Sequence, residues 1–402
     1  MRRKIYIAAY HQSRFGKLMG MGVPEILSRA VTGTLAQAGA DPAQVDVASV
    51  AAVCNLSLNG QGLLAGLVAQ VPGMGGKPIE TVENACASGG GAILSVVHKL
   101  LVGDGEVGLA LGYEKMRDVE GRMDSRLIGQ VLGAFSHPGD RPGRTIFAPH
   151  LFAEVMDLYM RQWGVTERDL AAIACQEYLN ANSNPYAQMQ DVRVTLDEAA
   201  TLGERNRYLV EGLPLKTYDS SQITDGYAGL LLATGEGLRR LGVARADCVE
   251  LAGYAQATDP LLTAGRDLLR PAGARRAMAR AYQMAGLEPA DVNVAELHDC
   301  FTVMAAIGTE VLGKAEPGRG AAYWVDGRAA PGGACGLNTS GGLIGKGHPI
   351  GATGIAMVGW CAWQLLGKVP PALQVPNARA AATFNIGGPI CASVCTVLKP
   401  AS

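Results

Sequence analysis

Residues 340–366 read SGGLIGKGHPIGATGIAMVGWCAWQLL, a glycine-rich loop that reaches a histidine and continues into a long apolar segment. Residues 83–101 read ENACASGGGAILSVVHKLL and repeat the same order, with Cys86 in the place of His348. In both stretches the small residues allow a helix to lie close against other backbone. The likeness predicts an internal duplication, in which two related halves each present one reactive side chain at the start of a helix.

The regions around both stretches alternate between strand and helix patterns. Short apolar runs predict buried strands, and longer segments with apolar residues every three or four positions predict helices. Such alternation is typical of an α/β protein with a largely parallel sheet. The expected strands are residues 5–9, 45–53, 107–116, 225–233, 249–255, 293–298, 381–387 and 391–398, and the expected helices include 22–38, 88–101 and 350–366.

Residues 118–245 interrupt this alternation. The segment is rich in proline and reads mostly as helix and loop, with one helix opened by the capping-box sequence TERD at 166–169. We expect it to be a helical cap inserted into a protein of two α/β halves. The first half would comprise residues 1–117 and 246–264, and the second half residues 265–402.

The composition excludes several classes of protein. The chain has 402 residues, 48% of them hydrophobic, and a formal net charge of −1, so it can bury a large core but shows no basic surface for nucleic acid or anionic membranes. No apolar run approaches the length of a membrane span. The nine cysteines are scattered without a CxxC motif, which predicts reduced thiols and a cytoplasmic location.

Cys86 is the first candidate for chemistry. A thiol at a helix start faces backbone N–H groups and the positive end of the helix dipole, which can lower its pKa from about 8.5 to roughly 3.5–7.5 and so favour the nucleophilic thiolate. The alternative is an inert cysteine packed among small residues. The stretch alone does not decide between the two.

Two further stretches carry histidine. His348 is flanked by glycines that let the backbone approach a ligand, and it can accept a proton from a thiol or stabilise an oxyanion; the alternative role is a helix cap. His298 and Cys300 lie two residues apart where a strand is expected to end, which is where α/β proteins place ligand sites. The alternative is an ordinary strand exit, with Asp299 capping the next helix.

A late glycine turn completes the set of candidates. Residues 384–389 read FNIGGP, a turn between two strands whose N–H groups could also face a site. The cysteines and histidines follow no zinc-ligand spacing, so we expect no metal site.

Together these stretches resemble the thiolase superfamily over nearly the whole chain. The resemblance implies the thiolase fold, with two pseudo-symmetric halves in a layered αβαβα arrangement and an inserted helical loop domain. The sequence HDCF at residues 298–301 is similar to the motif of sterol-carrier-protein-type thiolases and their bacterial and archaeal relatives. The better-known thiolases have NEAF at the same position. Besides the cysteine before its glycine-rich helix, the motifs are GYEKM at 112–116, DGYAGLLLAT at 225–234, HDCF at 298–301 and GHPIGATG at 347–354.

The resemblance implies a role for each candidate. Cys86 would be the nucleophile that accepts the acyl group, and His348 would activate it. His348 and His298 would together hold the thioester oxygen. The backbone N–H groups of Cys86 and Gly387 would form a second oxyanion hole, for the acyl-enzyme carbonyl.

One position departs from the common thiolase pattern. Many thiolases have Cys-x-Gly near the C-terminus, and that cysteine moves the proton of the substrate α-carbon. The matching residues here are Asn385-Ile386-Gly387. In the sterol-carrier-protein type the cysteine of HDCF is thought to take that role, so Cys300 is the expected acid and base.

The implied activity is that of a CoA-dependent thiolase, which makes or cleaves 3-oxoacyl-CoA by ping-pong Claisen chemistry through a Cys86 acyl-enzyme, as in fatty-acid β-oxidation. CoA and acyl-CoA thioesters would be its substrates. Arg141 and Arg144, in a Gly/Pro loop, are candidates for CoA contacts, with solvated surface arginines as the alternative. The resemblance also implies a homodimer or homotetramer and leaves room for a zinc/OB-fold accessory protein.

Three other functions stay open at this point. A decarboxylating ketosynthase or acyltransferase would use Cys86, His298 and His348 but has no need of Cys300. A thiolase-like aldolase of steroid side-chain degradation would lack the cysteine nucleophile. A non-catalytic subunit, held in a complex with a zinc/OB-fold partner, would not need all four reactive residues.

Overall fold

The computed structural model describes residues 3–144 and 146–401. The strands are β1 (Tyr6–Gln12), β2 (Val47–Ala51), β3 (Ile79–Val82), β4 (Val107–Glu114), β5 (Gly226–Ala233), β6 (Val249–Thr258), β7 (Val294–Leu297), β8 (Gly336–Leu337), β9 (Ala381–Gly387) and β10 (Ala392–Pro400). The helices are α1 (Val23–Ala36), α2 (Asn55–Asn59), α3 (Leu64–Ala69), α4 (Ser88–Val102), α5 (Ser125–Gly133), α6 (Phe147–Trp163), α7 (Glu167–Asn182), α8 (Leu196–Ala200), α9 (Gly235–Leu241), α10 (Ala272–Ala285), α11 (Thr302–Val311), α12 (Gly320–Val325) and α13 (Ile350–Leu365).

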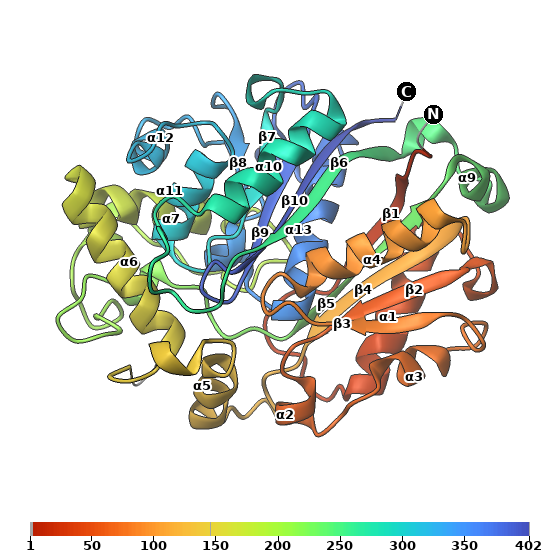
Figure 1. Ribbon diagram of the computed structural model, residues 1–402, viewed down its shortest axis with the longest axis horizontal. Helices are drawn as coiled ribbons and strands as arrows, with labels where there is room; N and C mark the ends of the chain where they lie inside the picture. The colour runs from red at the N-terminus through yellow and green to blue at the C-terminus, as the bar shows by residue number, and fades with distance from the viewer. Residues whose placement is uncertain (1–2, 145, 402) are drawn as a thin grey trace.

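The strands form one mixed sheet of ten strands in the order β3-β2-β4-β5-β1-β6-β10-β9-β7-β8 (Figure 1). The order is symmetric about the junction of β1 and β6, and so are the pairings. β2 pairs in parallel with β3 and β4, as β7 does with β8 and β9, while β5 and β10 run antiparallel to both of their neighbours. The predicted α/β class is confirmed.

The boundary between the halves differs from the predicted one. β6 pairs with β10 over nearly its whole length but with β1 at only two positions, so residues 249–258 belong to the second half. β5, which falls inside the predicted cap at 118–245, lies in the sheet between β4 and β1. The apolar runs identify both strands in the sequence, but only the pairing shows which half each strand joins.

Helices lie outside and between the two halves of the sheet. α1 covers β1, β4 and β5, and α10 covers β6 and β10 in the corresponding place. α13 contacts β4 and β5 of the first half and β7 and β9 of the second, with α4 packed beside it (Figure 1). The two glycine-rich stretches therefore form the central layer of the αβαβα arrangement.

α4 and α13 approach each other at backbone distance. A Cβ at Gly89 would lie 2.8 Å from the carbonyl oxygen of Gly351 and 2.9 Å from the amide nitrogen of Gly354, so only glycine fits there. This contact explains why both stretches are rich in glycine. By length and composition alone, residues Ala85–Val102 could also cross a membrane, but their apolar character is accounted for by packing at the centre of the fold.

The cap is a group of helices, α5 to α8, on one side of the sheet (Figure 1). α7 begins with the predicted capping box, in which the Thr166 hydroxyl accepts from the Asp169 N–H and the Asp169 carboxylate accepts from the Thr166 N–H. α7 also packs against α11, α12 and the π-helical turn Gly342–Lys346. The cap thus contacts the segment that leads to His348.

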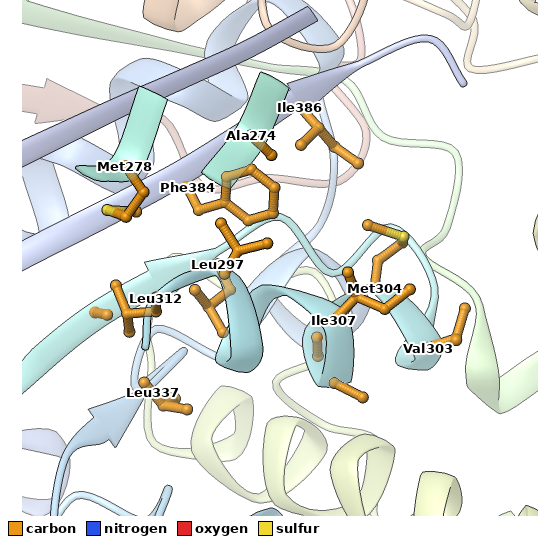
Figure 2. Close-up of a cluster of buried hydrophobic side chains, with 14 of the residues drawn as sticks. Ala274, Met278, Leu297, Val303, Met304, Ile307, Leu312, Leu337, Phe384 and Ile386 are labelled. Carbon is orange, nitrogen blue, oxygen red and sulfur yellow. The ribbon is translucent and has the colours of Figure 1, made fainter. Parts of the chain in front are cut away.

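A buried apolar cluster fixes β7 and β9 (Figure 2). Leu297 of β7 is in register with Phe384 of β9, and both side chains join residues of α10 and α11 in the cluster. Alternate residues of a strand face opposite sides, so Phe384 and Ile386 in the core direct Asn385 to the other face. The core thereby sets where Asn385 and the neighbouring His298 emerge.

Candidate active site

The four predicted reactive residues line a single pocket. Cys86, His298, Cys300 and His348 come from separate stretches of the chain, yet all border one cavity of about 180 Å³ beneath the cap. One side-chain atom from each of Cys86, His298 and His348 lies within 4.8 Å of the other two. The fold therefore assembles the group that the sequence motifs suggested.

A tight turn holds Cys86 at the start of α4. Ala85 adopts a left-handed conformation (φ +50°), which is costly for a residue with a Cβ and has to be held by its surroundings. The Ser88 hydroxyl accepts from the N–H of Asn84 and donates to the carbonyl of Ala85. The Glu83 carboxylate accepts from the N–H of Ala85. The sequence ENACAS thus encodes the turn as well as the thiol.

His348 presents a proton acceptor to the pocket. Its Nδ1 lies 2.7 Å from the hydroxyl oxygen of Thr353. That hydroxyl gives its own hydrogen to the carbonyl of Pro349, at 2.9 Å, so it accepts from His348 and assigns the imidazole hydrogen to Nδ1. Nε2 of His348 then has a free lone pair, and in this tautomer the ring can act as a base.

His298 has the opposite tautomer. The carboxamide of Asn385 is oriented by its neighbours, since its oxygen accepts from the N–H of Gly90 and its nitrogen donates to the carbonyl of Cys86 at 3.0 Å. The same nitrogen lies 3.1 Å from Nδ1 of His298, which therefore accepts. Nε2 of His298 carries the hydrogen, is buried, and has no hydrogen-bond partner among the described residues.

The two histidines give the site a base and a hydrogen-bond donor side by side. Their rings stand edge to face with centroids 5.0 Å apart. Once His348 has taken a proton from Cys86, both Nε2 atoms carry hydrogen and can donate to one oxygen. A buried N–H without a partner is costly, and it is typical of a site that accepts a ligand oxygen.

Cys86 and His348 rest as a neutral pair. Burial raises the pKa of the Cys86 thiol to about 12, the Glu114 carboxylate adds to the increase, and the N–H groups of Gly388 and Cys86 oppose it only in part. Burial lowers the pKa of His348 to about 3. The lowering of the Cys86 pKa that a helix start can cause is not seen, because desolvation outweighs the helix dipole. Proton transfer must accompany attack on the substrate.

The turn after β9 places Gly388, rather than the predicted Gly387, against the nucleophile. The N–H of Gly388 hydrogen-bonds to the Cys86 sulfur, and Gly388 lines the pocket. Gly387 packs against the turn before α4, where a Cβ would collide with the carbonyl oxygen of Asn84. The N–H groups of Cys86 and Gly388 therefore both face the Cys86 sulfur.

Cys300 is a second, neutral thiol in the pocket wall. Burial raises its pKa well above the ordinary value, and charge on Cys86 or Asp299 would raise it further. Its carbonyl accepts from the N–H of Ser221, which ties the HDCF stretch to the segment before β5. A neutral thiol beside the nucleophile can give a proton to a carbanion and later take one back.

Cys86, His298 and His348 also lie close enough to hold a metal ion. A histidine that ligates a metal offers the ion a lone pair and donates its other N–H to an acceptor. His298 does the reverse, because its Nδ1 accepts from Asn385 and its Nε2 toward the cluster carries the hydrogen. This arrangement argues against metal ligation and favours a hydrogen bond to an oxyanion.

Buried carboxyl groups support the HDCF stretch from behind. Asp299 accepts from the N–H groups of Leu343 and Ile344, at 2.8 and 3.0 Å, in the turn before α13. Glu177 of α7 accepts from the amide of Asn338 at 2.8 Å, and burial beside Asp299 raises the pKa of Glu177 well above its ordinary value. This direction favours a neutral Glu177 carboxyl group that hydrogen-bonds to Asp299.

The GYEKM and DGYAGLLLAT motifs hold the opposite wall. Glu114 accepts from the N–H groups of Cys54, at 2.8 Å, and Gly351, at 3.0 Å, and so fixes the start of α13. Lys115 and Asp225 form a buried ion pair at 2.9 Å. These residues position the elements of the site from outside its described lining.

Arg141 and Arg144, the two candidates for CoA contacts, both form hydrogen bonds within the cap. Arg141 donates to the carbonyl of Ser136 at 2.7 Å and to its hydroxyl. Arg144 pairs with Glu154 of α6 at 2.6 Å. Neither belongs to the described lining of the catalytic pocket.

Thr353 and Asn385 are functional residues that the sequence alone does not reveal. Thr353 follows His348 by five residues, so the motif brings it onto the first turn of α13 beneath the ring. Asn385 is a polar residue in a buried strand, and such a residue needs a partner. The signal in each case is positional, and the partner is visible only in the fold.

The fold and the site together define a cysteine-dependent acyl-transfer enzyme built from two related halves. Family models agree: the thiolase N-terminal domain matches residues 5–236, and the thiolase C-terminal domain-like model matches residues 255–400. The chain belongs to the thiolase family.

Individual relatives extend over the whole chain. The acetyl-CoA acetyltransferase of Methanothermobacter thermautotrophicus is 31% identical over 387 residues, which cover 96% of this chain and 97% of that protein. Human sterol carrier protein 2 is 30% identical over 403 residues, covering 96% and 70%. The Ltp2-ChsH2(DUF35) aldolase structure superimposes with a TM-score of 0.81 at 21% identity, covering 99% and 98%, and shows the fold alone. The protein is an acyltransferase of the thiolase type.

Proposed function

We propose that the protein makes or cleaves 3-oxoacyl-CoA through a Cys86 acyl-enzyme. The observation that carries the proposal is one thiol beside a proton acceptor, Nε2 of His348, and a hydrogen donor, Nε2 of His298, with the Cys300 thiol in the same pocket. CoA and acyl-CoA thioesters are the substrates, and no metal takes part.

In the degradative direction, the first half-reaction breaks the C2–C3 bond. The Cys86 sulfur attacks C3 of the 3-oxoacyl-CoA and gives its proton to His348. As the C2–C3 bond breaks, the acyl oxygen lies at the N–H groups of Cys86 and Gly388. The enolate oxygen of the departing acetyl-CoA accepts from Nε2 of both His298 and His348, and Cys300 protonates its C2.

The second half-reaction returns every proton. The Cys300 thiolate takes the proton of an incoming CoA thiol, and the CoA sulfur attacks the acyl group on Cys86. Cys86 leaves as a thiolate and recovers its proton from His348. Run in reverse, the same steps join two acyl groups by a Claisen condensation.

Replacing Cys300 by alanine tests the division of roles. Acylation of Cys86 by acetyl-CoA releases CoA as a thiolate, which is a far weaker base than the carbanion at C2, so this step should persist at a reduced rate without Cys300. Cleavage and formation of the C2–C3 bond should fall by about 10²–10⁴, the usual contribution of a general acid or base. The two rates are followed as exchange of labelled CoA and as thiolysis of acetoacetyl-CoA.

The same variant separates a thiolase from a decarboxylating ketosynthase. If Cys300→Ala retains full carbon–carbon bond formation with a malonyl thioester, the Cys300 role is wrong and the ketosynthase reading is favoured. Wild-type thiolysis of acetoacetyl-CoA, lost in the variant, supports the thiolase.

Assembly and location are further parts of the proposal. β3 lies at the edge of the sheet with one side open, which supports a homodimer, or a homotetramer of two dimers.

A zinc/OB-fold accessory protein is a second class of partner, supported by the likeness in fold to an aldolase whose name carries a DUF35 component. All nine cysteines are free thiols in the part of the chain that the structure describes, which supports a cytoplasmic enzyme supplied by β-oxidation.

A further inference from the structure

The catalytic pocket gathers most of the phenylalanines of the protein. The chain has six, and four of them line this pocket: Phe135, Phe147, Phe152 and Phe301. Phe152 and Phe301 stack on each other, with ring centroids 4.9 Å apart and planes inclined by 29°. Three of the four belong to the cap or its connections, so the cap supplies an aromatic roof over the nucleophile.

The remaining lining is also uncharged. Among the described residues, no lysine, arginine, aspartate or glutamate borders the pocket. Aliphatic and thioether side chains also line the pocket, including Met116, Leu132 and Ile350. A carboxylate on the acyl group would lose its water here and meet no cation, only the hydroxyl and carboxamide groups of Ser220, Ser221 and Gln222.

The aromatic roof stands next to the hole for the acyl oxygen. The backbone of Phe135 lies close to Gly388, since a Cβ on that glycine would be 3.2 Å from the carbonyl oxygen of Phe135. An acyl group on Cys86, with its oxygen at the N–H groups of Cys86 and Gly388, therefore lies close to Phe135, in the pocket that Phe147 also lines.

The size of the pocket limits what that chain can be. The cavity measures about 180 Å³, and an apolar protein cavity of about 150 Å³ is known to hold benzene. The cavity also has to hold the reacting carbonyl, so the group beyond it can be no larger than about one six-membered ring or a branched chain of similar volume. Four fused rings exceed it.

We infer that the enzyme prefers 3-oxoacyl-CoA substrates in which C3 bears an uncharged group the size of a single ring. The inference rests on the proposed thiolase function. With 3-oxo-3-phenylpropanoyl-CoA as the probe, Cys86 bonds to C3, the C2–C3 bond breaks, and benzoyl remains on the sulfur. Acetyl-CoA leaves with a proton from Cys300, and a CoA thiol then releases benzoyl-CoA.

A set of substrates tests the size and charge of the acyl group. We expect kcat/KM for the phenyl probe to exceed that for acetoacetyl-CoA by roughly ten- to hundredfold, the usual gain from burying a ring. The 4-carboxyphenyl analogue, of nearly the same shape, should fall at least tenfold below the phenyl probe, as should a 3-oxoacyl-CoA that carries a steroid nucleus. Equal or better turnover of acetoacetyl-CoA, of the charged analogue or of the steroid substrate would overturn the inference.

Substitutions in the roof test the residues. Phe147→Ala and, separately, the half-buried Phe135→Ala should each lower kcat/KM for the phenyl probe about tenfold more than kcat/KM for acetoacetyl-CoA. Leu158→Ala, an exposed position on the same helix as Phe147, is the control and should change neither. An equal loss on both substrates would contradict a role in selectivity. If no substrate acylates Cys86, the proposed function fails instead; acylation without a preference for the ring removes only this inference.

Discussion

At the scale of the residue, Asn385 decides which nitrogen of His298 carries the proton. Many thiolases have a cysteine at this position that moves protons itself. In this chain hydrogen bonds to Gly90 and Cys86 fix the orientation of the Asn385 carboxamide. Its N–H group therefore points at Nδ1 of His298, which must accept the hydrogen bond. In this chain Asn385 instead sets the tautomer of His298, the neighbouring side chain that can donate to an oxyanion.

Asn385→Asp should keep the size and shape of the side chain but move the proton of His298 from Nε2 to Nδ1. A carboxylate accepts from Nδ1, so Nε2 of His298 loses its hydrogen at neutral pH, and we expect the rate of C2–C3 cleavage to fall by about 10²–10³. The carboxylate also raises the pKa of His298, so the doubly protonated ring, with Nε2–H restored, should return activity as the pH falls from about 8 to 5. In the wild type burial holds the pKa of His298 well below its ordinary value, so no such rise is expected.

The comparison variant for this measurement is Asn385→Ala, which neither donates nor accepts. It should lose activity without the recovery at low pH. A pH profile of equal shape in both variants would show that Asn385 matters only for packing.

At the scale of the element, α7 is linked to the site by the proton between Glu177 and Asp299. The folded protein holds this proton above the ordinary Glu pKa of 4.5, whereas the unfolded chain releases it. Stability should therefore fall as the pH rises above about 4.5 toward the raised folded value, because the folded state binds more protons in that window.

Glu177→Gln should abolish this dependence, since the amide carries its own hydrogen and stays neutral. We expect the variant and the wild type to be similar in stability near pH 5. At higher pH the free energy of unfolding of the variant should exceed that of the wild type, by an amount that grows by up to about 1 kcal/mol per pH unit. Denaturant unfolding across this range measures it. A wild-type advantage that grows with pH would mean that Glu177 is ionised in the fold.

The elements themselves were largely predictable, for reasons visible in particular cases. α4 and β9 carry strong periodic or apolar patterns, and their predicted ranges differ from the observed ones by at most a residue at either end. The π-helical turn Gly342–Lys346 and the short β8 have no periodic pattern, because backbone hydrogen bonds donated to Asp299 form the turn and pairing with β7 forms the strand. The sequence also could not predict which half β6 belongs to, because that depends on strand pairing.

At the scale of the whole molecule, the contact between α4 and α13 joins the two halves at the nucleophile. Gly89→Ala places a methyl group against backbone atoms of Gly351 and Gly354, which cannot rotate away, and should destabilise the protein by about 1–3 kcal/mol. Gly129→Ala, also in a helix but with no atom within 4 Å of the added carbon, should cost nothing or stabilise slightly. Equal unfolding midpoints for the two variants would contradict this account of the centre.

The chemistry of the site divides in the same way between sequence and fold. The identities of Cys86, His298, Cys300 and His348 follow from motifs, because reaction chemistry demands those side chains. The tautomers, the neutral resting thiol and the use of Gly388 depend on hydrogen bonds and desolvation that arise only when distant stretches meet. Desolvation in particular reverses the pKa expected for Cys86 from its helix alone.

The central claim is that Cys86 accepts the acyl group, and intact-protein mass spectrometry after brief incubation with acetyl-CoA or acetoacetyl-CoA tests it most directly. The account predicts one acetyl adduct per chain, located at Cys86 by peptide mapping, absent in Cys86→Ala and discharged by added CoA. No adduct with either thioester, or an adduct that persists in Cys86→Ala, would contradict it.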